Sequence, residues 1–142
     1  MYSVCMNLPA LAILFTVYSA AGWVLDSFWR SVTDHKFERG GFSFLPLCPV
    51  YGVGAFVALW IESMTRQLPI PLEGLIMGLA LAALEYATGR LWLAIAGHRL
   101  WNYKKTLLNI GGHTDLFHFF VWGILGMILV RVVNPWLVSL IA

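Results

Sequence analysis

Charged residues are scarce in this chain. Only 11% of its 142 residues are Asp, Glu, Lys or Arg, whereas 60% are hydrophobic; soluble domains carry roughly 25% charged residues. So few charges cannot cover a water-facing surface, which excludes a soluble globular protein. The sequence therefore predicts an all-α, polytopic membrane protein. A chain of this length forms one compact transmembrane domain, residues 1–142, and leaves no room for a separate soluble domain.

Several functional signatures are also missing. The two cysteines, Cys5 and Cys48, form no Cys-x-x-Cys metal or redox pair, and we expect no disulfide between them. No basic stripe with interleaved aromatics occurs, so nucleic acid is not an expected partner. The ATP-binding loop G-x-x-x-x-G-K-[ST] is absent, so this chain cannot itself power ATP-driven transport. The segment MYSVCMNLPALAILF lacks the charged start and cleavage site of a signal peptide, and we expect a retained first helix.

Four long apolar runs predict four transmembrane helices. Their approximate ranges are 8–29, 49–66, 72–96 and 116–131. A short apolar tail, 132–142, would extend the last helix beyond a kink at Pro135. The first loop contains a double glycine and a proline, which permit sharp turns, and we expect it to be partly re-entrant.

The cations predict the orientation. The first and third loops each carry three Lys or Arg residues and the second carries one: Arg30, Lys36 and Arg39; Arg99, Lys104 and Lys105; and Arg66. The positive-inside rule then places loops one and three in the cytoplasm and both termini outside. We expect an integral protein of a bacterial cytoplasmic membrane.

Glu85 is the most informative residue. It lies about 20 Å along the apolar helix 72–96, given a rise of about 1.5 Å per residue. An acid at that depth must face protein or a water-filled cavity rather than lipid, and such residues are candidate functional sites. The alternative is a structural polar contact between helices.

Other polar residues gather at the same predicted end of the helices. Asp26 and Arg30, at i and i+4, can pair on the first helix, whereas Arg90 lies about 140° around its helix from Glu85. Arg30 is therefore the predicted partner of both acids. These four residues would line a site that opens toward the cytoplasm.

Glycines suggest two further features. Gly74 and Gly78 form a G-x-x-x-G step that fits either an intrachain or a dimer contact. The pattern G-G-x9-aromatic-G occurs at Gly40 and again at Gly111, offset by 71 residues. Two helical hairpins in the same orientation would give a parallel pseudo-twofold repeat. Chance matching of glycines is the alternative.

Several segments together resemble one known family. The stretches YSAAGWVLDSFWRS, RGGFSFLPLCPVYGVGA, LEYATGRLW, LWNYKKTLLNIGG and WGILG appear in order along most of the chain. They resemble the putative ABC-transporter type IV family, also called CmpB-like. The resemblance implies a small four-helix integral membrane protein with a transporter label. Asp26 stands where relatives commonly have Glu. The combined set of candidate ligand-binding residues is Asp26, Arg30, Glu85, Arg90, Tyr86, Trp101, Tyr103 and Asn109.

A metal site is a weaker candidate. His113, Asp115 and His118 offer zinc-type ligands within six residues, although they do not look like the family pattern. Alternatively, Thr114 or Asp115 caps the fourth helix, and His118 bonds to a neighbouring helix. The aromatic segment around Trp101 fits either an interfacial belt on anionic headgroups or a ligand-gating loop.

Three functions remain open. The first is a transporter or permease-like component with an inward-facing polar site for a small solute or lipid headgroup. The second is a non-catalytic membrane interaction or lipid-binding subunit. The third is an intramembrane enzyme that uses Glu85 as acid or base with His113 as a helper, but no nucleophile motif supports it. The bilayer is the expected environment, a homo-oligomer the expected assembly, and the sequence identifies no cofactor.

Overall fold

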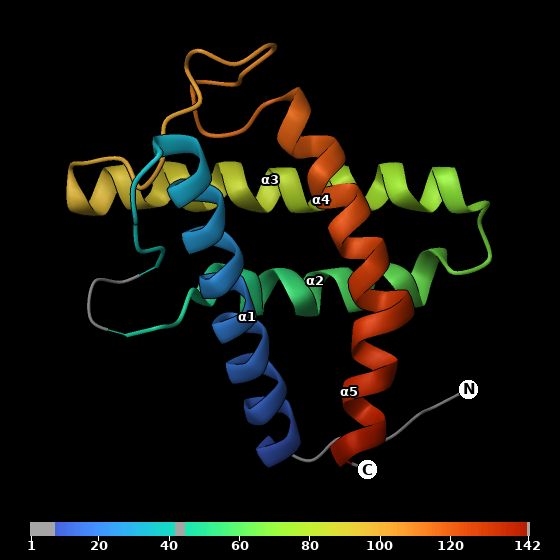
Figure 1. Cartoon of the computed structure of the whole chain (residues 1–142). Coiled ribbons are helices and arrows are strands. Elements are labelled where there is room, and N and C mark those ends of the chain that lie inside the picture. The colour runs from blue at the N-terminus through green and yellow to red at the C-terminus, as the bar shows by residue number, and fades with distance from the viewer. Residues whose placement is uncertain (1–7, 42–44, 142) are drawn as a thin grey trace. The chain divides into compact units, whose positions relative to one another are not determined.

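The protein is all-α, as the sequence predicts. The computed structural model describes residues 8–41 and 45–141; Cys5 and Phe42–Phe44 of the first loop lie outside them. Along the chain follow α1 (Leu8–Asp34), α2 (Pro49–Thr65), α3 (Ile70–Ala96), α4 (Leu116–Ile128), the π-helix η1 (Leu129–Val133) and α5 (Asn134–Ile141) (Figure 1). The four predicted helices are confirmed.

Three helical stretches are long and apolar enough to cross a membrane. They are α1 and α3, with 27 residues each, and the run Leu116–Leu140, with 25. The remaining long helix, α2, has only 17 residues, because the loop before Pro49 and the turn after Thr65 limit it. At about 1.5 Å per residue it is about 26 Å long, slightly less than a hydrocarbon core of about 30 Å.

The last helix continues past Arg131 instead of ending there. Figure 1 shows α4 and α5, in orange and red, as one continuous rod. Pro135 has no backbone N–H, and a π-turn accommodates it: the Asn134 N–H donates to the Leu129 carbonyl, five residues back. The predicted tail is therefore part of the membrane-spanning helix.

The chain divides into two compact units, residues 1–56 and 57–142. In the first unit, α1 packs against the start of α2. Gly22 lies directly on the Tyr51 side chain, and the Cys48 N–H donates to the Ser19 carbonyl at 2.9 Å. The small residues of α1 thus bring the two backbones together.

In the second unit, α4 crosses α3 at a glycine-lined contact (Figure 1). A Cβ at Gly78 would lie 2.6 Å from the Phe119 carbonyl oxygen, and one at Gly123 would lie 2.7 Å from that of Gly74. The predicted G-x-x-x-G step is therefore an intrachain contact. A core beside it consists of Ala58, Met77, Leu81 and Val130.

Gly123→Val is expected to destabilise the protein by roughly 1 to 3 kcal/mol, the usual cost of overpacking. The added side chain meets backbone atoms of α3, which cannot rotate away. Thermal unfolding in detergent measures the effect. Ile124→Val, next along the helix at a side chain that is 61% exposed, is the control and should change little. Equal stability of the two variants would contradict the close helix contact.

Candidate polar site in the second unit

Glu85 is buried in α3 with only 5% of its surface exposed. The Tyr103 hydroxyl donates to its Oε1 at 3.2 Å, and the side chains of Thr114 and Trp122 also lie against the carboxyl group. Its other oxygen, Oε2, is buried with no regular hydrogen bond to any residue that the structure describes. Tyr103 therefore makes the regular hydrogen bond to this carboxyl, and the Thr114 and Trp122 donors approach it without regular geometry.

Tyr103 reaches Glu85 from the loop between α3 and α4. Hydrogen bonds from side chains of this loop to its own backbone stabilise the loop conformation. The Asn109 amide donates to the carbonyls of Lys104 and Thr106, at 3.2 and 3.0 Å. The Trp101 indole donates to the His113 carbonyl at 2.7 Å. These polar groups of Asn109 and Trp101 are thus used inside the loop, where they place Tyr103.

His113 lies beside α3, under the loop. Its ring meets Tyr86 edge to face, with the centroids 5.8 Å apart, and its Nε2 is 3.4 Å from the Arg99 guanidinium. Burial, and then the charges of Arg99 and Arg90, lower the pKa of His113. The imidazole is therefore neutral near pH 7. Arg90, a predicted site residue, is itself exposed.

Asp115 caps α4, which confirms one of the two predicted roles of this segment. Its Oδ1 accepts from the His118 backbone N–H at 2.7 Å and lies 2.8 Å from the His118 Nδ1. The Thr106 hydroxyl donates to Oδ2. Burial opposes ionisation, but these hydrogen bonds outweigh it and lower the pKa of Asp115.

His118 connects the Asp115 cap to Tyr103, which donates to Glu85. The Tyr103 ring stacks on its imidazole, with the centroids 4.0 Å apart and the planes inclined by 18°. Among the residues described, no group of three or more His, Cys, Asp or Glu side chains is arranged to hold a metal ion. His113, Asp115 and His118 take part in the contacts of the loop and the cap, and the metal site stays a prediction.

Asp115→Ala is expected to cost roughly 1 to 2 kcal/mol, the usual loss for an N-cap. Because folding lowers the pKa of this carboxyl, its stabilisation is complete above the unfolded value of about 3.9 and is lost as the pH falls through the folded value. The difference from the native protein should therefore shrink below about pH 4. Thermal melts at neutral and acidic pH test this, with Asp34→Ala at the exposed end of α1 as the control.

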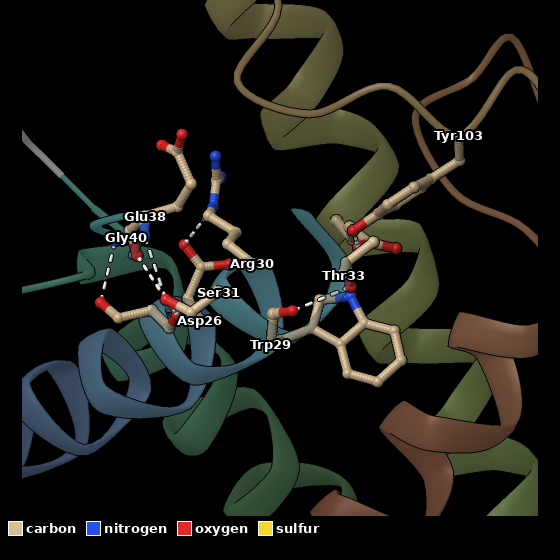
Figure 2. A network of polar contacts seen from close by, with 10 residues as sticks. Asp26, Trp29, Arg30, Ser31, Thr33, Glu38, Gly40 and Tyr103 are labelled. Carbon is tan, nitrogen blue, oxygen red and sulfur yellow. Dashed lines mark hydrogen bonds and ion pairs between the residues drawn. The ribbon is translucent and has the colours of Figure 1, made fainter. Parts of the chain in front are cut away.

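In the first unit, the predicted pairing of Asp26 with Arg30 is confirmed. The Arg30 Nε donates to Asp26 Oδ2 at 3.0 Å, one helical turn away (Figure 2). The other predicted partnership of Arg30, with Glu85, would join the two units and stays a prediction.

The loop that follows α1 folds back onto this pair. The Glu38 N–H donates to the Ser31 hydroxyl at 3.0 Å, and the Gly40 N–H donates to the Ser27 hydroxyl at 2.9 Å (Figure 2). Gly40 also lies against Asp26, where a Cβ would overlap the carboxylate. The loop therefore packs against the Asp26 side of the ion pair, and the Arg30 side chain stays 32% exposed.

A second ion pair inside the helices was not predicted from the sequence. The Arg131 guanidinium, on η1, donates to Oε2 of Glu73, whose side chain is completely buried in the first turn of α3. The available signal was the presence of two opposite charges inside apolar helices. Their pairing was hidden because the residues are 58 positions apart.

The comparisons agree with these features of a small helical membrane protein. A model of the family described as "Putative ABC-transporter type IV" matches residues 13–142. No curated protein and no solved structure matches the chain. The match begins within α1, continues to the end of the chain and includes both ion pairs and the Glu85 site, and the chain belongs to the putative ABC-transporter type IV family.

Proposed function

We propose that this protein is a transporter or permease-like membrane component whose polar site is centred on Glu85. The site would open toward the cytoplasm and take a small solute or a lipid headgroup. The observation that carries the proposal is the buried Glu85 carboxyl, whose Oε2 has no regular hydrogen bond to a described residue.

The cost of that arrangement supports a binding role. A buried acceptor without a hydrogen bond costs about 1 to 3 kcal/mol, and more if it is charged. A ligand that donates a hydrogen bond to Oε2 would recover this cost. Tyr103, supplied by the loop, already orients the other oxygen. The proposal includes a homo-oligomer, because a bundle of only four helices encloses little space alone.

Mass spectrometry of small molecules that co-purify with the protein tests the site. The native protein should carry a ligand that Glu85→Gln loses while it still elutes as a folded membrane protein. Glu38→Gln, the same change at an acid that pairs with Lys36 outside the helices, is the control and should retain the ligand. Retention by Glu85→Gln would favour the alternative of a non-catalytic lipid-binding subunit.

Cysteine labelling tests the proposed orientation. A cysteine at Lys104 should be shielded from an impermeant thiol reagent added outside intact cells, and one at Gln67 should react. A Cys5→Ser background removes the N-terminal thiol. Cys48 can stay, because it is buried and burial, followed by the charge of Asp26, raises the pKa of its thiol to about 12. The reverse labelling would move the site to the outer face.

A further inference from the structure

The first unit contains a set of contacts around Gly52 of α2. Gly52 packs against Phe15 and Ser19 of α1 so closely that a Cβ would overlap both side chains. The Cys48 backbone, one turn earlier, bonds to the Ser19 carbonyl, and Phe56, one turn later, stacks on Phe15. The residue before α2 and its first two turns thus follow α1.

The second unit contains the same set around Gly123 of α4. Gly123 packs against Gly74 and Gly78 of α3. The Phe119 carbonyl, one turn earlier, touches Gly78, and Met127, one turn later, lies beside Gly74. Each contact here has a counterpart in the first unit.

Corresponding contact residues are separated by one offset between α1 and α3 and by another between α2 and α4. Ser19 and Gly78 are 59 positions apart, as are Phe15 and Gly74, whereas Gly52 and Gly123 are 71 apart. The repeated glycine pattern in the sequence has the same offset of 71. The contact residues of α1 and α2 therefore correspond in register to those of α3 and α4. Chance placement of glycines does not explain this correspondence.

The same offset of 59 makes Asp26 the counterpart of Glu85, and Arg30 the counterpart of Gly89. In the first unit the acid is neutralised one turn away by Arg30. In the second unit the corresponding position has no side chain, and a Cβ there would lie 2.7 Å from His113 Nδ1. The His113 ring thus occupies the space that a side chain at position 89 would need.

No lysine or arginine among the described residues of the second unit takes the place of that arginine. The groups that act on Glu85 are the side chains of Tyr103, Thr114, Trp122 and His118, and no lysine or arginine is among them. His118 acts on Glu85 through its charge, but its Nδ1 lies 2.8 Å from the Asp115 carboxylate, and Tyr103 is a neutral donor. The second acid position therefore keeps its carboxyl without the arginine of the first, and the charge that acts there, on His118, is shared with Asp115.

We propose that the two acid positions of this repeat have diverged, and that Glu85 binds an exchangeable cation, either a proton or a small cationic solute, where Asp26 has a fixed arginine. The proposal rests on the function proposed above and names the class of its ligand. A cation satisfies both the charge and the Oε2 atom, which has no hydrogen bond of regular geometry, whereas an anion would face an uncompensated carboxylate.

Labelling with the hydrophobic reagent dicyclohexylcarbodiimide in native membranes tests this. A protonated carboxyl adds across one C=N bond, its proton passing to nitrogen, and the adduct rearranges to a stable N-acylurea that peptide mass spectrometry locates. Glu85 should be labelled several-fold more than Asp26 or Glu73, whose charges are paired. These two acids are controls within the same chain.

The competing cation identifies the source of the charge. Suppression of labelling by sodium, potassium or methylammonium, relative to choline at equal ionic strength, indicates a cationic solute; dependence on pH alone indicates a proton. Labelling needs no co-purified solute, so it can support the cation proposal even if mass spectrometry finds no ligand. Conversely, a ligand can co-purify although Glu85 is not labelled preferentially. Equal labelling of Asp26 and Glu85, or labelling of Glu85 only after Arg30→Gln, would overturn the proposal.

Discussion

Arg131→Met is expected to destabilise the protein by about 3 kcal/mol, the low end for removing one partner of a buried ion pair, because the Arg131 side chain is 39% exposed. Glu73, its partner, has no exposed surface, and Oε1 of the same carboxyl already has no regular hydrogen bond to a described residue. Without the guanidinium, an unpaired carboxyl group would remain buried between α3 and η1. Thermal unfolding in detergent, together with the yield of folded protein, measures the loss.

The double variant Glu73→Gln, Arg131→Met separates a stranded charge from lost packing. An amide of nearly the same shape carries no charge, so the double variant should be more stable than Arg131→Met alone. Lost contacts of the arginine stem would persist in both variants. Equal stability of the single and double variants would show that packing of Arg131, and not its charge, holds η1 to α3.

The helices were predictable because local signals agree at their ends. Pro49 begins α2, and Gly97 ends α3 in a left-handed conformation with φ of 73°, as a helix-terminating glycine does. The π-turn was not predictable in the same way. Pro135 forbids one regular hydrogen bond, but whether a helix then kinks, stops or takes a π-turn depends on packing such as that between Glu73 and Arg131.

The candidate site was predictable in part. A buried acid in an apolar helix identified Glu85, and its depth alone required a polar neighbour. The specific roles of Asn109 and Trp101 could not be predicted from the sequence. The same residue types can bond to nearby loop carbonyls or to a ligand, and the sequence does not distinguish these two uses. The contact of Tyr103 with Glu85 depends on the folded loop.

Arg30→Ala should lower the folded yield and cost about 3 kcal/mol, the low end for a buried pair, because the side chain of Asp26 retains 19% exposure. The measurement is detergent thermostability. Glu85→Gln should leave stability nearly unchanged, since an amide can still accept from Tyr103. The two variants therefore separate a structural charge from a binding one.

Adding Asp26→Asn to Arg30→Ala tests how many acids the arginine serves. If Asp26 is the only one, the amide removes the stranded charge and most of the lost stability returns. A deficit that persists until Glu85→Gln is also added would assign Arg30 to both acids. Glu85 would then have a resident cation, and the divergence of the two acid positions would be disproved by stability measurements alone.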